Sequence, residues 1–293
     1  MSDRAHPHKR RAKIKKILIG IGVFAAVFLV VVQIAEVFTE RQARYVPDYE
    51  KISLRTMLEE AGSELTEEGY EALFWQTGLG KDAADAIWSA RGDSIERLET
   101  FQDDFFHAKA YQCDKVGIIT REEHFVDEDG KVVRGFALAD VRNGDILVTK
   151  ATHSFGWRHG HAAIVIDAQL GKTVEAVMLG DVSKEQPLSK WRTYPTVIQL
   201  RWKDPEVAEA AALYAEEHLI GVPYGLLAGL LPRPEGTART TQCADLPWIA
   251  YAAFGVDLGN GIWPVTPKKI ANDESLAIVQ IYGVPPDAPW SVF

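Results

Sequence analysis

The stretch HAAIVIDAQLGKTVEAVML, His161–Leu179, carries the clearest signal for the fold of this 293-residue chain. Two apolar runs flank Gly171-Lys172, and short apolar runs on either side of a turn signal are typical of paired β-strands. We therefore expect an antiparallel pair whose first strand opens at His161. Further strands are expected in KVGIIT (115–120), NGDILVTK (143–150) and YPTVIQLRW (194–202), with a hairpin in HFVDEDGKVVRGF (124–136) around Asp129-Gly130.

Helical patterns lie on both sides of these strands. Between 52 and 112, apolar residues recur at three- and four-residue spacing, and Thr66 and Gly78 are placed as the start and stop signals of one helix. After the strands, DPEVAEAAALYAEEHLIG (204–221) predicts a helix capped by its first aspartate, and CADLPWIAYAAFG (243–255) predicts another. Strands between two groups of helices indicate an α+β fold with a mostly antiparallel sheet.

The N-terminal region differs in composition from the rest. Its first sixteen residues hold seven Lys or Arg and one acid, although the whole chain carries a net charge of −9. In ILIGIGVFAAVFLVVVQIA (17–35), Gln33 is the one polar residue, and about 20 apolar residues suffice to cross a bilayer. No clean small-x-small cleavage site follows, which favours an uncleaved signal anchor over a removed signal peptide. Basic flanks stay in the cytoplasm, so the rest of the chain is expected outside the cell membrane.

The negative net charge of the chain argues against nucleic acid as a partner. The patterns of charge and hydropathy predict five regions along the chain. The regions are a basic cytoplasmic tail (1–16), a transmembrane anchor (17–38), a polar stalk (39–51), a helical subdomain (52–112) and a catalytic-size domain (113–293).

Cys243 is the residue on which the chemistry depends. In the first turn of the predicted helix, free N–H groups and the helix dipole would favour the thiolate, which is the nucleophilic form. Pro247 complicates this, because a proline inside a helix removes a backbone bond; alternatively the helix starts later and Cys243 lies in a turn before it. A cysteine nucleophile also needs a base. We expect His161, at a strand end beside small residues, to be that base, with His159 as the second candidate on the same face.

Two other uses of these residues stay open. His153, His159 and His161 could hold a metal ion, although no helical histidine pair and no paired cysteines support such a site, and no cofactor is expected. Cys113 and Cys243, the two cysteines of the chain, could form a disulfide in an oxidising compartment. The domain would then be an anchored binding module without enzymatic activity.

Four segments carry a family resemblance. NGDILVTK, GHAAIVIDAQLGKTVEAV, GVPYGLL and QCADLPWIAY, in this order, resemble the permuted branch of the NlpC-type cell-wall cysteine hydrolases, often called YiiX/YebB-like. The resemblance covers roughly 141–282. It implies a permuted papain-like fold, in which an antiparallel sheet packs on helices and the histidine strand precedes the cysteine helix.

The resemblance also implies roles for particular residues. Cys243 would be the nucleophile, His161 the general base, and Glu175 the group that orients the imidazole. The register of a simple hairpin opposes this last role, because it sets Glu175 about 13 Å along the strand from His161, so a bulge, a shifted turn or strong twist is required. Tyr224 matches a tyrosine near the thiol; for substrate binding we expect Tyr224, His159 and Gln242.

The function expected from these features is that of a membrane-anchored, extracytoplasmic cysteine hydrolase. It would cleave amide bonds in cell-wall peptides through an acyl-enzyme. The same dyad would also serve an acyltransferase or a thioesterase that acts on lipid-type substrates. The expected partners are an amide substrate and, through the N-terminal helix, the membrane.

Overall fold

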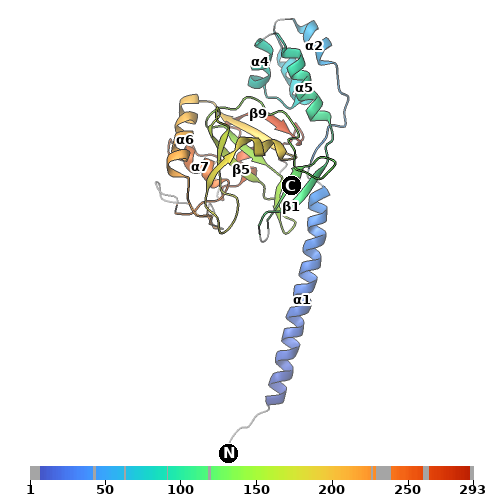
Figure 1. The fold of residues 1–293 in the computed structure, drawn as a ribbon, viewed down its shortest axis with the longest axis vertical. Helices are drawn as coiled ribbons and strands as arrows, with labels where there is room; N and C mark the ends of the chain where they lie inside the picture. The colour runs from blue at the N-terminus through green and yellow to red at the C-terminus, as the bar shows by residue number, and fades with distance from the viewer. Residues whose placement is uncertain are drawn as a thin grey trace, which may run out of the picture.

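The computed structural model describes residues 7–41, 44–62, 64–90, 92–117, 120–225, 227–228, 239–259 and 264–290; for residues 7–12, 40 and 41 it describes the backbone alone. Figure 1 shows a long N-terminal helix, α1 (Pro7–Arg41), that leads into a body of sheets and helices. The expected α+β class is confirmed, because the strands of both sheets pair antiparallel.

A six-stranded sheet of order β7-β6-β5-β3-β8-β9 forms the centre of the body. Helices α6 (Pro205–His218) and α7 (Asp245–Ala252) pack against β5, and α8 (Pro267–Ala271) packs against β3. This cover explains why the central strands read as continuous apolar runs. The strands are β3 (Ile146–Thr149), β5 (His161–Asp167), β6 (Lys172–Glu175), β7 (Lys184–Pro187), β8 (Val197–Trp202) and β9 (Leu276–Tyr282).

A smaller sheet, β1-β2-β4, consists of β1 (Tyr111–Lys115), β2 (Thr120–Phe125) and β4 (Thr152–Ser154). The strand expected at 115–120 is wrong, since one strand ends and the next begins at its limits; residues 118 and 119 lie outside the described part. The hairpin expected at 124–136 is reduced to a turn at Gly130 with a single bridge between Val126 and Val132. A 3-10 helix, η1 (Leu188–Thr193), joins β7 to β8.

Four helices precede the sheets and form their own apolar cluster. As predicted, Thr66 caps one of them by accepting a hydrogen bond from the Gly69 N–H, and Gly78 ends it in the left-handed conformation. The Gly80 N–H donates to the Val279 carbonyl of β9 at 2.9 Å, so the cluster is bound to the edge of the large sheet. The helices are α2 (Leu54–Ala61), α3 (Glu67–Thr77), α4 (Lys81–Ser89) and α5 (Ser94–Phe106).

Over Lys13–Thr39, α1 is long and apolar enough to cross a membrane. It continues past the expected end of the span to Arg41, and the expected stalk is bound to the body. Arg44 donates to the Tyr282 hydroxyl at 2.8 Å, and the backbone N–H of Tyr45 donates to the Gly283 carbonyl at 2.8 Å.

The last turns of α1 pack against the β2–β4 side of the body. Glu36 is buried, and its carboxylate lies 2.5 Å from Nδ1 of His153. The Thr39 carbonyl accepts a hydrogen bond from the Arg158 guanidinium at 2.6 Å, and that guanidinium also binds both oxygens of Glu123. Because buried ionic groups tolerate little displacement, these contacts fix the helix relative to the body.

Candidate active site

A bulge and a shifted turn in the central strand pair bring His161 and Glu175 together. Val165 pairs with Thr173, but Asp167 pairs with Lys172, so β5 contains one extra residue near its end. The simple hairpin set Glu175 opposite Val165. The turn is shifted by one residue and the bulge adds another, so this register sets Glu175 opposite Ala163, closer to His161 and still on the same face of the sheet. The Glu175 Oε2 atom lies 2.8 Å from Nε2 of His161. The bulge and the shifted turn together therefore resolve the conflict between the resemblance and the simple register.

The Glu175 carboxylate is fully buried and surrounded by donors. Besides the His161 ring, it accepts hydrogen bonds from the Thr173 hydroxyl at 2.9 Å, the Trp191 indole N–H at 2.9 Å and the Lys190 ammonium at 3.1 Å. Burial alone would raise the pKa of Glu175, but the hydrogen bond from His161 and the Lys190 charge outweigh it and hold the pKa well below its usual range. The site therefore contains a permanent negative charge behind the imidazole.

The His161 ring lies between this carboxylate and the Cys243 thiol. Burial lowers the pKa of His161, but hydrogen bonds to Cys243 and Glu175 and the attraction of their negative charges prevail and raise the pKa to about 9. The ring is thus an imidazolium near neutral pH. One ring nitrogen faces the carboxylate, which leaves the other for the sulfur.

Cys243 lies in a turn before α7, whose N-cap is Ala244. The position expected inside the first helical turn is wrong, and the alternative, a turn ahead of the helix, is confirmed. Pro247 is the third residue of α7, where an N–H group has no acceptor within the helix, so it does not interrupt the helix. The Cys243 side chain is 7% exposed, which leaves the sulfur at the edge of the core.

Two of the predicted substrate-binding residues lie next to the thiol. The backbone of Tyr224 forms a β-bridge with Thr241, two residues before Cys243. Burial, and to a lesser extent the electrostatic effect of Cys243, raise the pKa of the Tyr224 phenol. The Gln242 side-chain oxygen lies 3.8 Å from the Cys243 sulfur, while its amide nitrogen donates to the Val265 carbonyl at 2.9 Å. The structure therefore holds Gln242 in a fixed orientation beside the sulfur.

His159 is bound elsewhere. Its Nδ1 donates to the Gly160 carbonyl at 2.9 Å, and its Nε2 accepts from the Ser154 hydroxyl at 3.1 Å. Burial lowers the pKa of His159 and keeps the ring neutral. Both ring nitrogens are thus engaged within the β4–β5 connection, and of the two candidate bases His161 is the one that meets the thiol.

The sequence did not predict the aromatic residues of η1 and its C-terminal end that support the His161 ring. The Trp191 ring stacks on the His161 ring with centroids 5.7 Å apart and planes 13° from parallel. Tyr194, also buried, packs edge-on against Trp191. Their segment, QPLSKWRTY (186–194), has neither strand nor helix periodicity, and only the tertiary fold places it over the site.

The second cysteine has a histidine of its own. The Cys113 sulfur lies 3.3 Å from Nε2 of His153, and both cysteines are free, so the alternative of a Cys113–Cys243 disulfide is wrong. The Glu36 carboxylate lies 2.5 Å from the other nitrogen of His153, so this pair belongs to the packing of α1. In the part of the chain that the structure describes, no three His, Cys, Asp or Glu side chains are placed to hold a metal ion.

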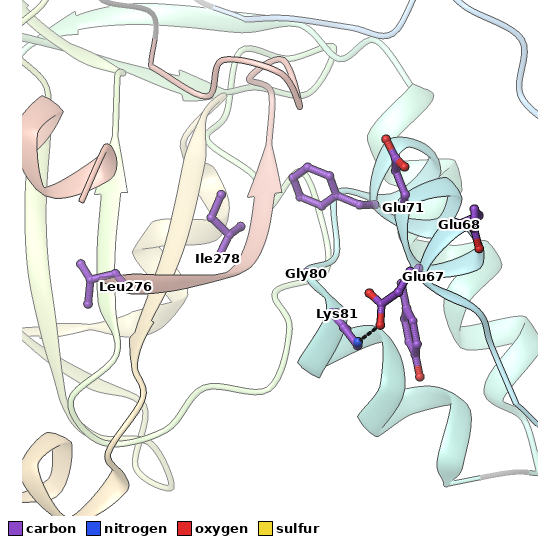
Figure 2. Close-up of a pocket in the computed structure, with 9 residues that line it drawn as sticks. Glu67, Glu68, Glu71, Gly80, Lys81, Leu276 and Ile278 are labelled. Carbon is purple, nitrogen blue, oxygen red and sulfur yellow. Dashed lines mark hydrogen bonds and ion pairs between the residues drawn. The ribbon is translucent and has the colours of Figure 1, made fainter. Parts of the chain in front are cut away.

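A separate hollow lies between α3, α4 and β9 (Figure 2). Glu67, Glu68 and Glu71 line one side, and Leu276 and Ile278 line the other. Its one ammonium, from Lys81, is paired with Glu67. Neither a cysteine nor a histidine lines this hollow, so it offers no nucleophile.

The chain matches no protein-family model, no curated protein and no solved structure. The site is therefore characterised by its own geometry. The turn before α7 supplies the Cys243 thiol, β5 supplies the His161 imidazolium, and β6 supplies the Glu175 carboxylate. Trp191 of η1 covers the His161 ring.

Proposed function

We propose that the protein is a membrane-anchored cysteine hydrolase of the permuted papain-like type that cleaves amide bonds. The observation that carries this proposal is the contact of buried His161 with both Glu175 and Cys243, which joins the β5–β6 strand pair to the turn before α7, a segment far along the sequence. A nucleophile, a base and a group that orients the base are the parts that covalent acyl transfer requires.

The first half of the reaction forms an acyl-enzyme. The Cys243 sulfur attacks the amide carbonyl carbon, and the carbonyl π electrons move to the oxygen, where backbone N–H groups at the start of α7 stabilise the charge. The tetrahedral intermediate then collapses and expels the amine, which takes a proton from the His161 imidazolium. Glu175 holds the ring in position and stabilises its cationic form.

The second half releases the product. Neutral His161 removes a proton from a water molecule, and the resulting hydroxide attacks the thioester carbon. Collapse of this intermediate breaks the C–S bond, releases a carboxylic acid and restores the Cys243–His161 pair for the next cycle.

Cell-wall peptides are the substrate class that the family resemblance favours. The basic flank of α1 supports a cytoplasmic N-terminus, which would place the body on the outer side of the membrane, where such peptides occur. An acyltransferase or thioesterase acting on lipid-type substrates would use the same three residues, so the substrate panel must include both classes.

The test is hydrolysis by the full chain in phospholipid vesicles, with cell-wall muropeptides and acyl esters as substrates and mass spectrometry as the readout. We expect muropeptide cleavage, and a loss of at least about a thousandfold in Cys243→Ser and in His161→Gln. Cys113→Ser is the matched control and should retain activity, since that thiol faces His153. Retained activity in Cys243→Ser would contradict the mechanism, and cleavage of acyl esters alone would move the assignment to lipid substrates.

A further inference from the structure

The connection between β4 and β5 (residues 155–160) begins with Phe155, Gly156 and Trp157, here called the aromatic tip. Phe155 is 49% exposed and Trp157 is 68% exposed. Phe155 has a φ of 53°, the one described non-glycine residue with a positive φ, which is unfavourable for a bulky side chain. The charged neighbour Arg158 turns inward to Glu123, so the tip presents apolar surface alone.

The aromatic tip lies against α1. The Phe155 and Phe28 rings are 6.4 Å apart between centroids. Gly156 packs so closely that a Cβ atom there would lie 2.4 Å from Cβ of Ala35, and its carbonyl accepts a hydrogen bond from the Thr39 hydroxyl at 2.8 Å. The tip is thus fixed along the last part of the apolar helix.

This position sets the depth of the tip. Phe28 precedes Ala35, the last residue of the apolar run, by seven residues, which is about 10 Å along a helix. A ring that touches Phe28 therefore lies below the level at which the helix leaves the hydrocarbon region. Figure 1 agrees, because loops of the body lie beside the upper turns of α1.

We propose that the aromatic tip inserts into the bilayer leaflet from which α1 emerges, so that phospholipid covers Phe155 and Trp157. Tryptophan is enriched at this interface because its ring is apolar and its N–H is polar. The proposal rests on the membrane anchor of the proposed function, but not on its chemistry. Trp157 and His161 are four residues apart, at most about 14 Å of chain, so insertion also holds the thiol site near the headgroups.

The test measures tryptophan fluorescence of the full chain in phosphatidylcholine vesicles. The chain has eight tryptophans, so the signal of Trp157 is the difference between the wild type and Trp157→Phe. Acyl chains brominated near the headgroup quench tryptophans in contact with lipid, whereas acrylamide quenches those in water. We expect bromolipid to quench the wild type and Trp157→Phe to lose most of that quenching. Trp88→Phe is the matched control and should keep it, because Trp88 is buried in the helical cluster, and its helix α4 lies at the end of the molecule opposite the N-terminal end of α1 (Figure 1).

Three results would overturn the proposal. Equal bromolipid quenching in wild type and Trp157→Phe would show that Trp157 does not touch lipid, and acrylamide quenching of Trp157 would place it in water. Shielding of Trp157 from both quenchers would mean that protein, such as a second copy of the chain, covers the tip. Release of the chain by alkaline carbonate would refute the anchor itself, while an inactive enzyme with normal quenching would refute the hydrolase alone.

Discussion

Replacing Glu175 with glutamine removes the negative charge that faces the His161 ring and keeps the size of the side chain. In the native protein the pKa of His161 is raised from 6.5 to about 9, a difference that corresponds to about 3 kcal/mol. Removal of one nearby opposite charge shifts a pKa by about 1–3. We therefore expect Glu175→Gln to lower the pKa of His161 by about that amount, toward or below neutrality.

The same shift predicts a pH dependence of stability. The pKa of His161 is higher in the folded state than in the unfolded chain, so protonation of His161 stabilises the fold. This contribution to the free energy of unfolding is complete below about pH 6.5 and disappears as the pH rises through about 9. The native protein should thus lose up to about 3 kcal/mol of folding free energy across this window. In Glu175→Gln the loss should be smaller and should occur at lower pH.

The assay is the ¹³Cε1 chemical shift of labelled histidine, titrated through this window, with the His161 signal identified by its absence in His161→Gln. Urea unfolding at both ends of the window measures the stability term. Glu185→Gln is the matched control, because Glu185 is a half-exposed carboxylate on the neighbouring strand and pairs with Lys172. A His161 pKa at or below 6.5 in the native protein, or an unchanged value in Glu175→Gln, would refute the reasoning.

Three further predictions concern supporting contacts. Trp191→Phe keeps an aromatic ring over His161 but loses the hydrogen bond to Glu175, so urea unfolding should show a loss of about 1.5–3 kcal/mol. Gly80→Ala would place a Cβ 1.8 Å from the Ile278 carbonyl oxygen and push the helical cluster away from β9. Thermal unfolding should therefore show a loss of folding free energy of about 1–3 kcal/mol or more. An unchanged melting curve would contradict that close packing. Asp204→Ala removes the side chain that caps α6 and should cost about 1 kcal/mol in urea unfolding; no change would mean that water replaces the cap.

Local signals predicted the elements that local physics determines. Asp204 accepts hydrogen bonds from two N–H groups at the start of α6, and the strands at 161–167 and 197–202 follow from runs of apolar and β-branched residues. The dyad was also within reach of the sequence, since the thiol and the histidine each stand at the end of a predicted element.

What could not be predicted depends on contacts between distant segments. β9 pairs with β8 across more than seventy residues, and this pairing could not be predicted, although the run LAIVQIY (276–282) carries a strand signal that the sequence prediction missed. The bulge between Val165 and Asp167, together with a turn shifted by one residue, decides that Glu175 meets His161, yet a single extra residue in a strand leaves no pattern. Trp191 belongs to the site only because η1 folds back over β5 and β6.

The contacts of Glu36 and Thr39 with the body bear on how the protein should be prepared. A truncation that starts after the first helix would leave Arg158 without one of its carbonyl acceptors and would remove Glu36 from beside His153, where only Glu123 would remain. Unsatisfied buried polar groups of this kind cost about 1–3 kcal/mol each. A clipped fragment would therefore be less stable than the intact molecule. Full-length material in detergent is the form from which thermal stability and turnover should be measured.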